Sequence, residues 1–189
     1  MTDEIGALLD VLRLPERKRT TTEERLQAIE DKIAIRELML AYGYLCDARR
    51  WHDLVEHFTE DVERLLGGTL TEHTIGKTEL LQRYLAPALT AANEEVTLRD
   101  NADVETYGLK HLMVDDVVRL SDDGDEAWAV ARTQLVATSE STAGFQRGAH
   151  EASHVFQFRR VGGEWKIARF AVFSNAAHNP LFGARAREP

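Results

Sequence analysis

The segment RELMLAYGYLCDARRW, residues 36–51, has the pattern of a helix whose last turns are almost entirely apolar until an aspartate follows at position 47. Counting back from Asp47 in steps of seven gives Leu40, Ile33 and Leu26. This spacing predicts that Asp47 lies on the helix face that packs against a core. Because an uncompensated carboxylate is unfavourable in apolar surroundings, we expect Asp47 to be paired, protonated or placed beside a cavity.

Asp47 also has a simpler interpretation, in which it only ends this helix and caps the next one, close to Arg49 and Arg50. Two tyrosines precede it. Tyr44 lies one turn before Asp47 on nearly the same face, whereas Tyr42 is about 140° round the helix from Asp47. Both are candidates for a site beside the carboxylate, and the alternative for each is a place in the core.

The composition excludes several classes of protein. A chain of 189 residues fits one domain with at most a small appendage. Its 23 basic and 32 acidic residues give a net charge of -9, so neither nucleic acid nor an anionic membrane is an expected partner. The single cysteine, Cys46, cannot form an internal disulfide or a zinc site, and no apolar run approaches ~18 residues. The first residues do not resemble a signal peptide, and we expect a cytoplasmic location.

The chain divides into three expected parts. Residues 1–21 suggest a short helix and a linker, residues 22–175 a domain, and residues 176–189 an irregular tail. Thr21 and Glu24 have the spacing of a capping box and precede a periodic segment that predicts a helix from about residue 23 to residue 46. Further elements are expected as follows: a short helix over 51–58, a brief strand over 62–68 and a helix over 76–95 that is interrupted at Pro87.

The second half of the chain has the alternation that is typical of strands. It begins at about residue 109, and the strand-like runs are separated by SDDGD at 121–125, ESTAGFQRG at 140–148 and VGGE at 161–164. Helices come first and antiparallel strands follow. This order predicts an α+β domain in which helices pack on one face of a curved sheet.

A strand through LKHLMVDDVVRL, residues 109–120, would have two different faces. One face is apolar and consists of Leu112, Val114, Val118 and Leu120. The other is mixed and consists of Leu109, His111, Met113, Asp115 and Val117. Apolar and titratable residues together are typical of a pocket lining, because low dielectric shifts the pKa of a His or Asp. His111 is therefore a candidate catalytic base, and a structural histidine is the alternative.

Polar groups also recur among large apolar side chains on one predicted face of each later strand. These faces consist of Trp128, Val130, Arg132, Gln134 and Val136; of His150, Ala152, His154, Phe156 and Phe158; and of Trp165, Ile167, Arg169, Ala171 and Phe173. The candidates for substrate binding are Tyr44, Met113, Asp115, Trp128, Arg132, His150, Phe156 and Arg169. Alternatively, the two arginines pair with acidic residues at a rim, and His150 and His154 lie at an exposed edge. We expect no metal, because no His–carboxylate pair combines helical ligand spacing with a buried face.

Three motifs in this order resemble the SnoaL-like group of the nuclear transport factor 2-like superfamily, over roughly residues 22–175. The first helix of that group has an acidic–Leu step, a tyrosine and, five residues later, an aspartate; here these are Glu37, Leu38, Tyr42 and Asp47. HLMVDDV matches the family strand with a histidine and a polar residue four positions later, and GGEWKI matches its Gly-x-Trp hairpin. The resemblance implies a cone-shaped α+β barrel, with a curved mixed, mainly antiparallel sheet wrapped by N-terminal helices.

The resemblance also implies a chemistry. In similar enzymes, such as scytalone dehydratase, bile-acid dehydratase and hexachlorocyclohexane dehydrochlorinase, a His–Asp pair abstracts a carbon-bound proton without a cofactor. Here His111 would be the base, Asp47 would orient and stabilise its imidazole, and Tyr42 would hydrogen-bond the substrate carbonyl or leaving hydroxyl. The implied function is a cofactor-independent lyase or isomerase, foremost a dehydratase, acting on a hydrophobic oxygenated small molecule.

Two residues depart from the family pattern. Asp115 stands where an asparagine is common and could compete with Asp47 for the ring of His111. Phe170 stands where the dehydrochlorinase has a cationic residue, so halide elimination is not expected. Two other functions stay open: a non-catalytic partner, such as the small subunit of an aromatic-ring dioxygenase, or a small-molecule-binding module. An open sheet edge and the habits of the group imply a homo-oligomer, either a dimer or a trimer.

Overall fold

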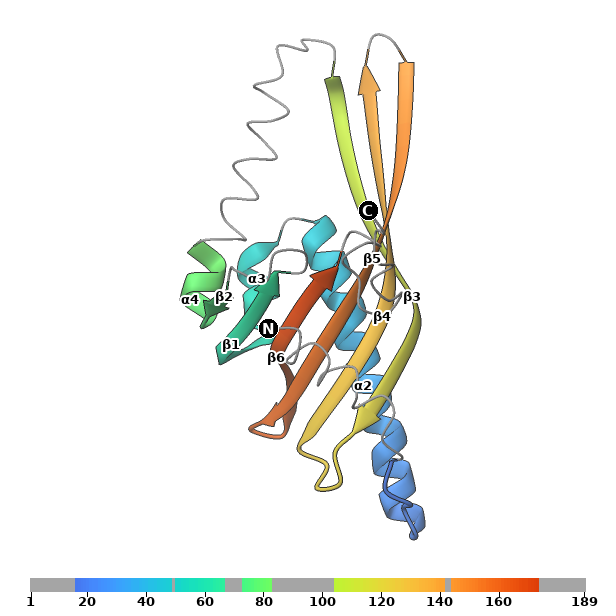
Figure 1. Cartoon of the computed structure of the whole chain (residues 1–189), viewed down its shortest axis with the longest axis vertical. Helices are drawn as coiled ribbons and strands as arrows, with labels where there is room; N and C mark the ends of the chain where they lie inside the picture. Colours follow the sequence, from blue (N-terminus) through green and yellow to red (C-terminus); the bar gives the residue numbers. More distant parts are fainter. Residues whose placement is uncertain (1–15, 49, 67–72, 83–103, 142–143, 174–189) are drawn as a thin grey trace, which may run out of the picture.

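The computed structural model describes residues 16–48, 50–66, 73–82, 104–141 and 144–173. Two helices come first and most of the sheet follows, as the sequence predicts, with a short helix between the second and third strands (Figure 1). The elements in chain order are α2 (Thr22–Asp47), α3 (Trp51–Val55), β1 (Phe58–Leu66), β2 (His73–Ile75), α4 (Lys77–Leu80), β3 (Val104–Leu120), β4 (Glu126–Ser141), β5 (Gly144–Val161) and β6 (Glu164–Phe173). Pro87 and most of the helix expected over 76–95 lie outside the described residues, as do the expected N-terminal helix and the C-terminal tail.

The strands form one six-stranded sheet in the order β2-β1-β6-β5-β4-β3. β1 and β6 are parallel, and every other neighbouring pair is antiparallel. The predicted mixed, mainly antiparallel sheet of an α+β fold is therefore confirmed. The sheet is open, with β2 and β3 at its edges, and α2 lies along one of its faces (Figure 1). None of the helices in the described part of the chain has the length and apolar character that crossing a bilayer requires.

Helix α2 begins with the capping box that the sequence predicts. The hydroxyl of Thr21 accepts a hydrogen bond from the backbone N–H of Glu24 at 3.1 Å, and the carboxylate of Glu24 accepts one from the backbone N–H of Thr21 at 3.2 Å. Such a cap contributes about 1 kcal/mol to helix stability. The helix ends at Asp47, after which the N–H of Ala48 donates to the carbonyl of Tyr44 at 2.9 Å.

The predicted core-facing stripe of α2 is wrong. Leu26, Ile33 and Leu40 are 54%, 50% and 46% exposed, so the heptad positions face away from the core. The face that is buried consists of Ala28, Asp31, Ile35, Leu38, Met39, Tyr42, Gly43 and Cys46. Because this face includes small residues and a carboxylate, its pattern in the sequence is weaker than that of the exposed leucines and isoleucines. Asp47 is partly buried for a different reason, which is its contact with β3.

The predicted single apolar face of β3 is also wrong, because the strand contains a bulge. The register with β4 shifts between Val114 and Val117, and Asp115 has a φ of 52°. After the bulge Val118 and Leu120 are buried in the core, whereas before it Leu112 and Val114 are 45% and 47% exposed. One extra residue moves the following side chains to the other face of a strand.

Candidate functional site

Asp47 and His111 lie in direct contact where the last turn of α2 meets the middle of β3. Nδ1 of His111 is 2.5 Å from Oδ1 of Asp47. The backbone N–H of His111 lies 3.0 Å from each carboxylate oxygen of Asp47. The side chain of His111 is 12% exposed, and that of Asp47 is 19% exposed. Both the ring and the backbone of His111 are therefore held by one carboxylate.

A glycine allows this close approach of helix and strand. A Cβ atom placed on Gly43 would lie 3.3 Å from Cβ of His111, which is tighter than most real contacts of that kind. About two turns earlier, Arg36 pairs with Asp116 of β3 at 2.6 Å. These contacts hold α2 against β3 before the bulge and within it. The close approach to His111 explains why the small residue stands at position 43.

The contact with Asp47 determines what the His111 ring can do. A carboxylate accepts hydrogen bonds, so the partner atom Nδ1 carries the proton in the neutral ring. The other nitrogen, Nε2, then has the lone pair that can accept a proton. If it does so, the imidazolium that forms lies next to the negative charge of Asp47. The arrangement is that of an oriented general base.

Tyr42 lies in an aromatic cluster beneath the pair. Its ring is in edge contact with the rings of His154, Phe156, Phe170 and Phe58, at centroid distances of 5.7, 5.6, 5.9 and 6.5 Å. Burial raises the pKa of Tyr42 well above its ordinary value, with a smaller contribution from Cys46. Tyr42 therefore stays a neutral O–H group among apolar side chains.

His154 of β5 is a site residue that the sequence analysis did not select. The residue is 1% exposed, so the alternative that placed it at an exposed edge is wrong. Nδ1 of His154 is 2.7 Å from the hydroxyl of Thr133, and the ring stacks on Phe156 at 5.7 Å. Burial lowers the pKa of His154 to about 3, with further lowering by His111 and Arg64. The sequence signal that could have indicated its burial is that His154 shares a strand face with Phe156 and Phe158.

Two of the predicted substrate-binding residues lie near these groups. Phe156 is fully buried and contacts both Tyr42 and His154. Met113 lies two residues after His111 on β3 and packs, partly buried, against the core cluster. Together with Tyr42, they give the side of the pair that faces the core an apolar and aromatic character.

Other predicted residues lie elsewhere. Tyr44 is 73% exposed on the outer face of α2. Asp115 lies in the bulge, 3.5 Å from Arg132, and these side chains are 69% and 60% exposed, so Asp115 does not compete with Asp47 for the ring. Arg169 pairs with Glu63 at 2.5 Å.

Two strand positions remain. Trp128 lies on β4 at odd spacing from Thr133, and therefore on the sheet face opposite to the one that carries His154. The side chain of His150 lies outside the described residues.

A groove of about 550 Å³ lies away from the pair, between α2 and the turn that joins β5 to β6. Its walls include Gln27, Glu37, His57, Arg160, Trp165 and Lys166, but not Asp47, His111 or Tyr42. Burial lowers the pKa of His57, and the charge of Lys166 lowers it further.

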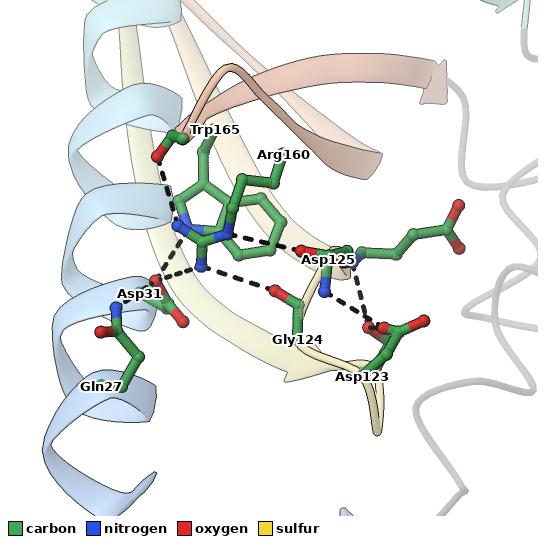
Figure 2. A network of polar contacts seen from close by, with 10 residues as sticks. Gln27, Asp31, Asp123, Gly124, Asp125, Arg160 and Trp165 are labelled. Carbon is green, nitrogen blue, oxygen red and sulfur yellow. Dashed lines mark hydrogen bonds and ion pairs between the residues drawn. The ribbon is translucent and has the colours of Figure 1, made fainter. Parts of the chain in front are cut away.

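A buried carboxylate, that of Asp31, lines this groove and is the centre of a polar network (Figure 2). Asp31 receives hydrogen bonds from Arg160 at 2.6 Å, from Trp165 at 3.1 Å and from Gln27 at 3.1 Å. The guanidinium of Arg160 also lies 4.4 Å from the centroid of the Trp165 ring. All three donors bond to Oδ1 of Asp31, and the network attaches the β5–β6 hairpin to α2. The GGEWKI motif of the sequence thus has a structural part in this fold.

Within the ranges that the structure describes, no group of three or more His, Cys, Asp or Glu side chains is arranged to hold a metal ion. The contact between Asp47 and His111 provides an oriented imidazole that can accept a proton. His154, with its ring centroid 6.5 Å from that of His111, is a second and neutral imidazole.

Comparison with known proteins identifies the family of this chain. Residues 27–171 match the family described as SnoaL-like domain. A search of curated protein sequences gave no match. Among similar solved structures, an NTF2-like protein with a cystatin-like fold from Novosphingobium aromaticivorans has 22% identity and a TM-score of 0.61, covering 87% of this chain and 96% of that one.

Two further solved structures have the same fold at lower identity. A candidate scytalone dehydratase from the same organism has 18% identity and a TM-score of 0.54, covering 79% of this chain and 87% of that one. LinA has 16% identity and a TM-score of 0.58, covering 80% of this chain and 90% of that one. At these identities the similarity shows the fold alone.

Proposed function

This chain belongs to the family of SnoaL-like domain proteins, and we propose that it is a cofactor-independent lyase or isomerase in which His111 abstracts a carbon-bound proton. The observation that carries the proposal is the contact of Nδ1 of His111 with Asp47 at 2.5 Å, together with the two backbone contacts. This contact orients the ring and leaves Nε2 as the base.

The reaction that fits best is the dehydration of a β-hydroxy carbonyl compound. Nε2 of His111 takes the proton next to the carbonyl, and the electrons of the C–H bond move toward the carbonyl oxygen as an enolate forms. The β C–O bond then breaks, the carbon–carbon double bond forms, and the hydroxyl leaves as water with the proton returned from the imidazolium. Asp47 stabilises that imidazolium throughout.

Neutral donors would serve the enolate oxygen. Burial keeps Tyr42 protonated, so its hydroxyl can donate a hydrogen bond to the oxygen on which negative charge develops. The rings of Phe156 and Phe170, which contact Tyr42, give this side of the site an apolar character. They support a hydrophobic, oxygenated substrate, and the similar structure described as a candidate scytalone dehydratase suits a dehydration.

The experiment is a screen of β-hydroxy ketones and related hydroxylated carbonyl compounds for loss of water, followed by ultraviolet absorption of the conjugated product. Wild-type protein is compared with His111→Gln and with His52→Gln, a matched histidine variant at an exposed position of α3. Turnover that survives in His52→Gln and is lost in His111→Gln would support the proposal. Equal turnover in all three proteins would refute it.

The binding-module and helper-subunit functions differ from the proposal in one measurable respect. A binding module would bind members of the same panel, measured by calorimetry, without converting any of them. In that case His111→Gln would change affinity and not rate. A helper subunit would show neither property alone, and would purify with a larger catalytic chain.

A further inference from the structure

The outer face of α2 is apolar along most of its length. Leu26, Ile29, Ile33, Leu40 and Tyr44 are 54%, 57%, 50%, 46% and 73% exposed. At about 100° per residue, these five positions fall within a sector of roughly 60°, on the side of the helix opposite to the buried face. We call these five residues the outer stripe. Exposed apolar side chains gathered on one side of a helix in this way mark an interaction site.

The outer stripe has part of the spacing of a coiled-coil seam. Leu26, Ile33 and Leu40 repeat every seven residues, and Ile29 takes the second apolar position of the first heptad. Arg36 and Gly43 take that second position in the next two heptads. A strict seven-residue repeat keeps the same side of a helix turned toward a partner helix. A helix that only covers its own sheet has no need of such a repeat on its outer face.

Charged residues flank the outer stripe with opposite signs on its two sides. Arg25 and Lys32 precede the seam residues by one position, and Glu30 and Glu37 follow them by four. These are the positions that set partner and orientation in coiled coils. In a parallel pair of identical helices, the basic side of one helix meets the acidic side of the other. In an antiparallel pair, like charges would meet.

We propose that the outer stripe is an interface between two copies of this chain, whose α2 helices pack in parallel about a two-fold axis. Arg25 then faces Glu30 of the second copy, and Lys32 faces its Glu37. Within its own chain Lys32 pairs with Glu16 at 2.8 Å, and so it would bridge the two carboxylates. The self-complementary charges favour an identical helix as the occupant, because one helix supplies both signs in the required order.

The oligomeric state tests the proposal. Sedimentation equilibrium of the wild-type chain should give twice the chain mass of 21.3 kDa, and Ile33→Asp should give the chain mass itself. The matched control is Val161→Asp, which places the same charge on an apolar residue that is 47% exposed but lies outside the outer stripe. This control should remain a dimer. A monomeric wild type, as expected if another segment of the chain covers the outer stripe, or a dimeric Ile33→Asp protein would overturn the proposal.

Charge and cross-linking test the orientation. The doubly substituted Arg25→Glu/Lys32→Glu and Glu30→Lys/Glu37→Lys proteins should each be monomeric, and their equimolar mixture should restore the dimer. In a parallel pair Leu26 lies beside Leu26 of the other copy, so Leu26→Cys should cross-link to itself under mild oxidation. The wild type, whose Cys46 is buried, is the background control. Cross-links that form only between Leu26→Cys and Leu40→Cys proteins would show antiparallel helices and contradict the proposal.

Discussion

The imidazole rings of His111 and His154 lie edge to face, with their centroids 6.5 Å apart and their planes at 72°. His154 is neutral, because burial lowers its pKa to about 3. A second positive charge at this distance would oppose protonation of His111 by roughly 2.5 kcal/mol at an effective dielectric constant of about 20. The neutral state of His154 therefore lets His111 take up a proton without repulsion from its neighbour.

Replacement of the proposed base should remove most activity without unfolding the protein. We expect His111→Ala to lower kcat by about 10²-fold or more on a substrate found by the screen, because it removes the imidazole that Asp47 orients as the base. Ligand affinity should change little. Steady-state kinetics and calorimetry measure the two effects, with His52→Ala as the control. Full turnover in His111→Ala would make the pair structural.

Asp47→Asn should show whether the charge and hydrogen bonding of the Asp47 side chain, and not only its shape, support the activity of His111. The amide has nearly the same size, but it neither balances an imidazolium charge nor accepts with both of its polar atoms, so kcat should fall by about 10²-fold or more. The free energy of unfolding should fall by about 1 kcal/mol, because one backbone contact of His111 loses its acceptor. Asp47→Glu retains the carboxylate and tests partial rescue of the rate. An unchanged rate in Asp47→Asn would exclude a role in positioning.

Tyr42→Phe should have a smaller effect than either change. It removes one hydrogen-bond donor, and loss of a single oxyanion donor lowers kcat by at most about 10²- to 10³-fold. A control is available in Cys46→Ala, which removes the neighbouring thiol but leaves the phenol of Tyr42 in place. Steady-state kinetics and thermal denaturation of both variants distinguish the loss of the hydrogen-bond donor from a change in core packing. A Tyr42→Phe protein slower than His111→Ala would assign the phenol a larger role than we propose.

Stability should fall on acidification because of His154. Its pKa is about 3 in the folded chain, against about 6.5 when unfolded, so between these values the unfolded state binds more protons. Stability from this group is complete above about pH 6.5 and declines as pH falls toward 3, with a slope approaching 1.4 kcal/mol per pH unit. His154→Gln should reduce that slope. Urea denaturation at pH 7, 5.5 and 4.5 measures it, and an identical pH dependence in the variant would exclude His154 as the cause.

Asp31→Ala should destabilise the fold strongly. It leaves the guanidinium of Arg160 and the indole N–H of Trp165 without their shared acceptor, and breaking a buried pair costs about 3 kcal/mol or more. The matched control is Asp61→Ala, which breaks the exposed pair with Arg159 at 3.0 Å and should cost no more than about 1 kcal/mol. Denaturant unfolding compares them. Equal losses would mean that the network in Figure 2 adds little.

The parts of the fold that could be predicted are those with short-range chemical signals. The capping box at Thr21 and Glu24 marked the start of α2, and alternation marked the strands. The α2 face that packs on the sheet could not be recognised, because Ala28, Asp31 and Gly43 dilute its apolar pattern. The more regular stripe of larger apolar residues lies outside. Asp47 was selected for its position on that stripe, yet its contact with His111 results from a helix end meeting a strand.

Two of the remaining errors result from strand irregularities. Two residues on the same strand face at even spacing stay together only if no bulge lies between them. The register shifts in β3 after Val114, and the β5–β6 register shifts between Gln157 and Phe158. The second shift puts Phe170, in place of Arg169, on the strand face that carries Ile167. The even spacing of His154 from Phe156 and Phe158 is consistent with its burial. However, one polar residue in the strand pattern does not indicate which face of the strand packs against the core.

The bulge at Asp115 also divides β3 into two halves with opposite phase. Before it, the odd-numbered His111 and Met113 face the core side; after it, the even-numbered Val118 and Leu120 do so. Deleting one residue at this point would restore a regular ladder but would force one half outward, exposing either the imidazole or the two apolar anchors. The extra residue thus allows one edge strand to place both the imidazole of His111 and the apolar side chains of Val118 and Leu120 on the same side of the sheet.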